Sequence, residues 1–168
     1  EIAQPMIDFT PWDEMLRAYV NDQGQVDYTH WQQESATALD RWLESLQTVD
    51  LQTLDRETAI ALLINLYNAL TIQQVLHKYP IRSIRPKILG VPNWIAFWWF
   101  FTKRIYALGG QSLSLNQIEH GMLRSQFAEP RIHFALVCAS GGCPLLRAGA
   151  YFPDQLSSQL EADAQRFI

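Results

Sequence analysis

Cysteine, charge and long apolar runs are all scarce in this sequence of 168 residues. The two cysteines leave the redox compartment open. Charged residues make up only 18%, the formal net charge is −4, and Lys and Arg form no block, which argues against nucleic acid as a partner. The apolar segment WIAFWWFF at residues 94–101 is shorter than the roughly 20 residues that span a bilayer. We therefore expect no transmembrane segment.

Sequence motifs for metals, nucleotides and serine hydrolases are missing too. The two cysteines and the four histidines show no paired spacing of the zinc type. The glycine pairs at 109–110 and 141–142 fit neither phosphate-binding pattern. The sequence has no nucleophile elbow. From these absences we predict that the protein uses no metal and no cofactor.

The composition that remains is that of a folded domain. Hydrophobic residues make up 48% of the chain, which excludes disorder, and the length suffices for one domain with a substantial core. The start of the chain has no signal-peptide pattern. The last predicted helix, from about Pro153, has no stop signal before Ile168. We therefore expect residues 1–168 to form a single domain that lacks a C-terminal segment.

Apolar periodicity predicts helices at residues 9–20, with Thr10 as N-cap, and at 29–47, 55–79 and 114–124. The helix at 55–79 is apolar on nearly all sides between Ala59 and Ile72, so it should be buried. Residues 81–94 contain prolines and are predicted to be a loop. Residues 101–115 are predicted to form a hairpin that turns at Gly109-Gly110. The fold class is therefore α+β: a mainly helical domain around a long buried central helix, with a small antiparallel β-hairpin.

Two asparagines interrupt the apolar central helix. Asn65 and Asn68 are three residues apart and share a face. Burying an unpaired amide costs roughly 1–3 kcal/mol, so both should have hydrogen-bond partners. Loop backbone near Cys138 is one candidate partner. The two amides would then either fix loops in place or bind substrate.

The stretch RIHFALVCASGGCPLLR, residues 131–147, suggests three roles for Cys138. The residue could be a buried apolar filler, or it could form a disulfide with Cys143, which closes a short loop and contributes roughly 2 kcal/mol. As a nucleophile it would need a lowered pKa and access. The small residues after it would let a substrate approach, among them Ser140, and the amides of Gly141 and Gly142 could bind an oxyanion. The glycines could equally serve only to reverse the chain.

A nucleophilic cysteine needs a base, and two histidines are candidates. His133 is nearest in sequence, but five residues separate it from Cys138, which turns the two apart by about 140° in a helix and to opposite faces in a strand. His120 is the better candidate, with Glu119, Asn65 or Asn68 orienting its ring. Adjacent helical residues do not face each other well. Glu119 could instead belong to a capping box that starts at Asn116.

Three segments follow one another along the chain: INLYNALTIQQVL, LSLNQIEHGMLR and PRIHFALVCASGGCPLL. With these three segments in this order, the chain resembles the domain of unknown function 547 family, which is found in secreted bacterial proteins and in plants. The similarity runs from about Phe9 to the end of the chain. It implies a mixed α+β domain and points to functional positions, which are Asn65, Asn68, Glu119, His120 and Cys138. It also implies secretion or a periplasmic location and a further C-terminal segment with aromatic residues. In this family Cys143 need not be a cysteine, so the resemblance requires no disulfide.

Our leading hypothesis is a thiol-dependent hydrolase or acyl transferase that acts on a peptide-like amide or thioester. Cys138 would be the nucleophile, His120 the base and Glu119 its orienting partner. Substrate-binding residues would come from three segments: Asn65, Asn68, His133, Ser140, Gly141 and Gly142. The alternative is a non-catalytic secreted binding module with structural cysteines. In either case the aromatic residues at 94–101 offer a surface for self-association.

Overall fold

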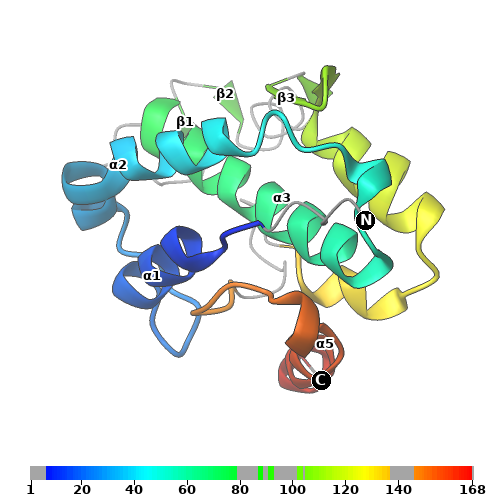
Figure 1. The fold of residues 1–168 in the computed structure, drawn as a ribbon. Helices are drawn as coiled ribbons and strands as arrows, with labels where there is room; N and C mark the ends of the chain where they lie inside the picture. The colour runs from blue at the N-terminus through cyan, green and yellow to red at the C-terminus, as the bar shows by residue number, and fades with distance from the viewer. Residues whose placement is uncertain are drawn as a thin grey trace.

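One long helix, α3 (Arg56–Lys78), runs through the middle of the computed structural model, and the other elements pack around it (Figure 1). The structure describes residues 7–78, 87–88, 91–92, 102–103, 105–136 and 146–167. Every residue from Ala59 to Ile72 is at most 6% exposed. The segment Arg56–His77 is long and apolar enough to cross a membrane, but 94% of its most apolar stretch is buried inside the protein. The predicted buried central helix is confirmed.

Helices α1 (Thr10–Tyr19) and α2 (Tyr28–Ser45) cover one side of α3. Their apolar faces meet through three buried tryptophans, and the ring of Trp12 lies 5.8 Å from those of Trp31 and Trp42. The prediction that Thr10 caps α1 is wrong. Thr10 is the first helical residue, because the side chain of Asp8 accepts its amide at 3.0 Å and so holds the chain one residue earlier.

Two short antiparallel strand pairs are present. Strands β3 (Tyr106–Leu108) and β4 (Gln111–Leu113) form the predicted hairpin, and Gly109 and Gly110 turn it with positive φ angles of 56° and 86°. Strands β1 (Lys87–Ile88) and β2 (Val91–Pro92) pair inside the stretch 81–94 that was predicted to be a loop. Two-residue strands are too short for the alternating pattern by which a strand is recognised.

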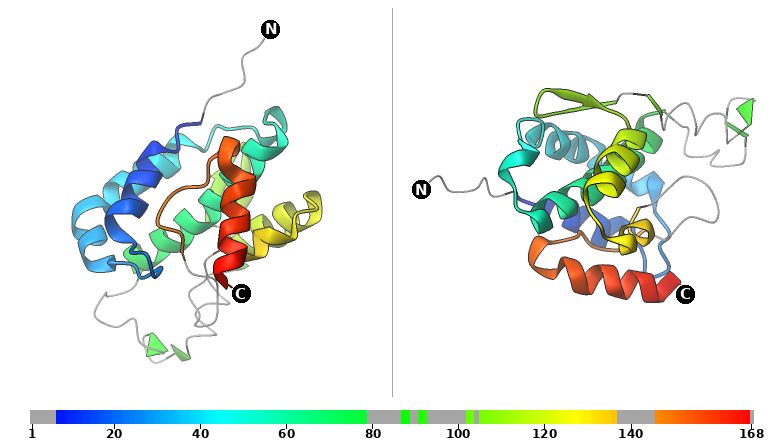
Figure 2. Two further views of the ribbon diagram at one scale, coloured as in Figure 1. Left: turned by 90° about the horizontal axis from the view of Figure 1, so that it is seen from below. Right: turned by 90° about the vertical axis from the view of Figure 1, so that its right-hand side faces the viewer.

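The remaining elements are short helical turns and one further α-helix. They are the 3₁₀ turn η1 (Leu51–Thr53), the π-helix η3 (Gln117–Arg124), the 3₁₀ helix η4 (Pro130–Phe134), the 3₁₀ turn η5 (Pro153–Gln155) and helix α5 (Leu156–Phe167). The right-hand view of Figure 2 shows η3 and η4 between the β3–β4 hairpin and α5. The chain is therefore a mainly helical α+β fold, as predicted.

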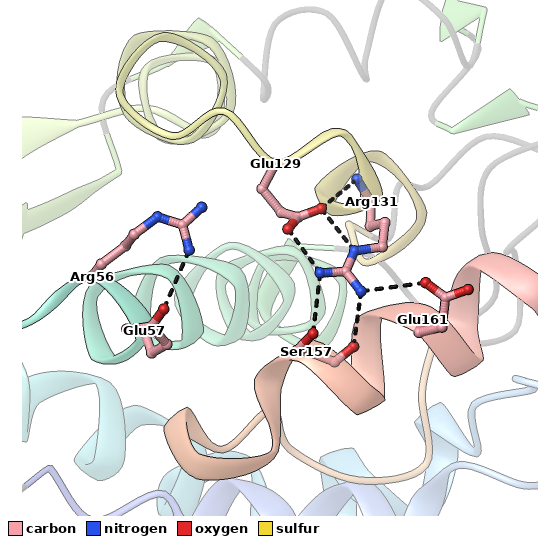
Figure 3. A network of polar contacts seen from close by, with 6 residues as sticks. All are labelled: Arg56, Glu57, Glu129, Arg131, Ser157 and Glu161. Atoms are coloured by element: carbon pink, nitrogen blue, oxygen red, sulfur yellow. Dashed lines mark hydrogen bonds and ion pairs between the residues drawn. The ribbon is translucent and has the colours of Figure 1, made fainter.

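Arg131 fastens η4 to α5 through a set of charge-assisted contacts (Figure 3). Its guanidinium binds both carboxylate oxygens of Glu129 at 2.8 Å. It also donates to the Ser157 carbonyl at 3.1 Å and to Glu161 at 3.3 Å. Because η4 precedes residues 137–145, this network fixes the direction from which the chain enters the cysteine-containing segment.

Candidate functional site

Asn65 holds the backbone of Tyr151 by two hydrogen bonds. The Asn65 Nδ2 group donates to the Tyr151 carbonyl at 2.8 Å, and the Tyr151 amide donates to Asn65 Oδ1 at 3.0 Å. The asparagine is 0% exposed. The side chain thus uses its donor and its acceptor on one backbone unit, which is the loop-fixing role considered for it from the sequence.

Asn68, one turn further along α3, holds a second segment. Its Nδ2 group donates to the Ala135 carbonyl at 2.9 Å, and the residue is 2% exposed. Ala135 comes shortly before residues 137–145 and Tyr151 comes shortly after them. One face of α3 therefore anchors the chain on both sides of this segment. The predicted substrate contacts of Asn65 and Asn68 stay a prediction.

Several predicted site residues lie outside the described residues. Within 137–145 these are Cys138, Ser140, Gly141, Gly142 and Cys143, and the aromatic stretch 94–101 is likewise outside. The three alternatives for Cys138 therefore stay open. The described residues do place Glu119, His120 and His133, together with the partners of each.

Glu119 and His120 form an ion pair on η3. Glu119 Oε2 lies 2.8 Å from His120 Nε2, and the two side chains are 15% and 51% exposed. Adjacent helical residues were expected to point apart, but both side chains are long enough to bend together. The carboxylate accepts from Nε2, so in the neutral ring Nδ1 is the basic nitrogen. This is the arrangement of an orienting acid and its histidine.

The capping box predicted from Asn116 to Glu119 is wrong. Asn116 makes no side-chain cap bond. The reciprocal pair lies two residues earlier, where the Gln117 amide donates to Ser114 Oγ at 3.1 Å and the Ser114 amide donates to Gln117 Oε1 at 2.9 Å. The sequence contains both Ser-x-x-Gln and Asn-x-x-Glu, and the helix starts at the first. The Glu119 side chain therefore has no part in the helix cap and can contact other residues.

Tyr67 on the central helix is a site residue that the sequence reasoning missed. The side chain is 2% exposed and its hydroxyl is hydrogen-bonded to Glu119. Burial raises the pKa of the Tyr67 phenol well above its ordinary value, and the neighbouring Glu119 charge raises that pKa further. The phenol therefore stays protonated and donates to the carboxylate. The sequence does contain one indication of this residue, because the Tyr67 hydroxyl lies between Asn65 and Asn68 in an otherwise apolar helix.

Two further residues lie next to the cluster of Tyr67, Glu119 and His120: Arg124 on η3 and His133 on η4. Arg124 Nη2 lies 3.8 Å from Glu119 Oε2 and 3.2 Å from His133 Nδ1. In a π-helix the backbone bonds join residues i and i+5, which brings Glu119 and Arg124 to one side. π-Helical turns are frequent at functional sites. No local sequence pattern indicates a π-helix, and Arg124 was missed for that reason.

The described cluster suits proton transfer better than metal binding. No group of three His, Cys, Asp or Glu side chains that could hold a metal ion occurs among the described residues. The pair of Glu119 and His120 combines an imidazole with an orienting carboxylate, which is a donor set used in general acid–base catalysis. Arg124 adds a guanidinium suited to an anionic group.

Comparison with known proteins agrees with the segments that carry the resemblance. The family described as "Protein of unknown function, DUF547" matches residues 51–168, which include α3, η3, η4 and α5. Helices α1 and α2 precede the matched region. No curated protein and no solved structure matches the chain. Because the match covers well over half of the sequence, the chain belongs to the DUF547 family.

Proposed function

We propose that this protein is a thiol-dependent hydrolase or acyl transferase acting on a peptide-like amide or thioester. Cys138 is the nucleophile, His120 the general base, and Glu119 the group that orients His120. The amides of Gly141 and Gly142 stabilise the oxyanion. The observation that carries the proposal is the 2.8 Å contact between Glu119 and His120.

The surroundings of Glu119 support this assignment. The carboxylate has no capping role, it is 15% exposed, and the buried Tyr67 hydroxyl donates to it. A buried donor fixes the carboxylate, and the carboxylate then fixes both the ring orientation and the tautomer of His120.

The anchoring of the chain supports the choice of Cys138. Tyr67 and Asn68 are consecutive on α3, so the residue that bonds Glu119 adjoins the residue that bonds Ala135. Cys138 follows Ala135 by three residues in the sequence. Three extended residues span at most about 11 Å. The proposed nucleophile is therefore tethered by a short stretch of chain to the residue that Asn68 holds.

The reaction follows from these roles. His120 Nδ1 takes the thiol proton of Cys138, and the thiolate attacks the acyl carbon to form a tetrahedral intermediate. The intermediate expels the leaving amine or thiol, which receives the proton from His120, and an acyl thioester remains on Cys138. Water, or a second acceptor, then attacks the thioester while His120 removes its proton. The product carboxylic acid or acyl conjugate leaves and the thiol is restored.

The alkylation rate of each cysteine against pH tests the proposal. A nucleophilic Cys138 has a thiol pKa below the ordinary value of about 8.5, so it should react with iodoacetamide at pH 6 much faster than Cys143. His120→Ala should remove most of the difference between the two cysteines, and His133→Ala should leave it largely intact. Mass spectrometry assigns the label to each cysteine.

Two outcomes would overturn the assignment. Equal rates for the two cysteines, or a Cys138–Cys143 bond in the native protein, would instead favour a binding module with structural cysteines. If only His133→Ala removed the reactivity, Cys138 would remain the nucleophile and His120 would not be its base.

A further inference from the structure

An open hollow of about 430 Å³ lies directly beside the Arg124–His133 contact. Its apolar walls come from the end of η3, the turn after it and η4, and consist of Leu123, Phe127, Ala128, Pro130 and Ile132. Leu123 and Ile132 are 0% and 2% exposed and belong to the hydrophobic core, so the apolar surface open to a ligand comes from Phe127, Ala128 and Pro130. The volume falls in the range of about 300–1,000 Å³ that is usual for small-molecule sites.

The polar rim of this hollow carries charges of both signs, and its carboxylate is already paired. Arg124, His133 and Glu129 stand on it. The Glu129 carboxylate is held on both oxygens by Arg131 at 2.8 Å, which also keeps the pKa of Glu129 below its usual value, so its charge is compensated. Among the described residues, the carboxylate partner of Arg124 is Glu119, which is distant at 3.8 Å and also contacts His120.

The Arg124–His133 bond sets which hydrogen the histidine offers. Arginine donates to His133 Nδ1, so the neutral ring carries its hydrogen on Nε2. Both side chains are exposed. The rim therefore presents a guanidinium and an imidazole N–H from two different elements next to an apolar wall. This combination is complementary to a carboxylate that is attached close to an apolar side chain.

We propose that this hollow binds the C-terminal residue of a peptide-like substrate, with the carboxylate on Arg124 and His133 and an apolar side chain against Phe127, Ala128 and Pro130. The inference rests on the proposed acyl-transfer function, because Arg124 also contacts Glu119, the partner of His120. The scissile acyl group then lies on the His120 side of Arg124. The site selects substrates with a free C-terminus and an apolar last residue.

Equilibrium binding of three small probes, followed by amide chemical shifts in NMR, tests the site without any need for activity. N-acetyl-L-leucine has both the carboxylate and the apolar side chain, N-acetyl-L-leucinamide lacks the charge, and N-acetylglycine lacks the side chain. N-acetyl-L-leucine should shift amides of residues 123–133 and bind about tenfold more tightly than either other probe, as the loss of one charge-assisted bond or one buried side chain implies.

Variants assign the preference to one arginine. Arg124→Gln should lower N-acetyl-L-leucine binding to the level of the amide probe, and Arg124→Lys should have an intermediate effect because lysine lacks the planar fork. Arg41→Gln removes the same charge from an exposed position on α2 and should change nothing. Equal binding of all three probes, or shifts outside residues 123–133, would overturn the proposal.

The test of the C-terminal binding site and the test of the acyl-transfer function can give different results. A reactive Cys138 that depends on His120, with no carboxylate preference at Arg124, would refute the C-terminal site alone. A carboxylate preference at Arg124 with an unreactive Cys138 would refute the acyl-transfer chemistry, and the hollow would remain as a binding site for peptide C-termini.

Discussion

A buried asparagine must place both a donor and an acceptor, and Asn65 places both on Tyr151. Asn65→Ala should therefore leave the amide and the carbonyl of Tyr151 unpaired in the core and lower the free energy of unfolding by about 1–3 kcal/mol. Asn65→Asp keeps the shape but puts a carboxylate oxygen against the Tyr151 carbonyl, so it should also destabilise. The urea midpoint measures both effects.

Gln165→Ala is the matched control for this prediction. Gln165 is an exposed amide on α5 whose contact with Glu161 is long, at 3.3 Å, so its loss should be nearly neutral. Asn65→Ala with the same midpoint as Gln165→Ala would show that the Asn65 bonds contribute nothing to stability.

The cap of η3 gives a second prediction at this scale. Ser114→Ala removes the acceptor for the Gln117 amide and should cost about 1 kcal/mol of stability. Asn116→Ala, two residues further on, should be within about 0.5 kcal/mol of the wild type, as is usual for a surface position without a special contact. The reverse order in thermal unfolding would restore the Asn116–Glu119 capping box and return Glu119 to a structural role.

Among elements, the junction of η4 and α5 depends on charge. The side-chain bond from Arg131 lowers the pKa of the Glu129 carboxyl. A carboxyl with a lowered folded pKa adds stability above its unfolded pKa, about 4.3, and this stability is lost as pH falls through the folded value. Glu129→Gln should therefore reduce the urea midpoint most at pH 7, and the difference from wild type should shrink below pH 4.

Glu57→Gln provides the control for this pH dependence. Glu57 has one contact, with Arg56 at 3.3 Å, and its side chain is 53% exposed. Such pairs contribute little to stability, so the midpoint should track the wild type across the whole pH range. A Glu129→Gln difference that persisted unchanged at pH 3 would mean that the contribution of Glu129 to stability does not come from its ion pair with Arg131.

Elements with strong local signals could be predicted from the sequence. The apolar run from Ala59 to Ile72 gave the buried helix, and Gly109-Gly110 gave the hairpin. The start of α1 and the cap of η3 were not predictable, because two nearby polar residues fit the capping pattern in each case. These are Asp8 and Thr10 around the start of α1, and Ser114 and Asn116 before η3. The β1–β2 pair was missed because two residues cannot display a period.

The candidate site was predictable in part for the same reason. Glu119 and His120 are polar residues on an otherwise amphipathic helix, so the sequence drew attention to them, and the buried asparagines had to have partners. Tyr67 and Arg124 join the site only through a hydroxyl aimed between elements and through π-helical geometry. The π-helical geometry is not encoded in a local pattern, and only the fold shows which group the Tyr67 hydroxyl meets.

At the scale of the whole molecule, α3 acts as the frame of the site. Three contacts leave a single turn of it: Asn65 to Tyr151, Tyr67 to Glu119 and Asn68 to Ala135. The helix therefore connects η3, η4 and the segment before η5. Acyl transfer needs reacting groups held in fixed relation, and a helix buried on all sides is a rigid means of holding them.

Acylation of Cys138 by p-nitrophenyl acetate, located by mass spectrometry of the intact and digested protein, tests the central claim most directly. The proposed chemistry predicts an acetyl thioester that forms on Cys138 and not on Cys143, and is then lost to water. His120→Ala should slow its formation roughly 100-fold or more, as loss of a general base does, and Glu119→Gln should slow it less. Equal labelling of both cysteines, or labelling of Cys138 that is unchanged in His120→Ala, would contradict the account.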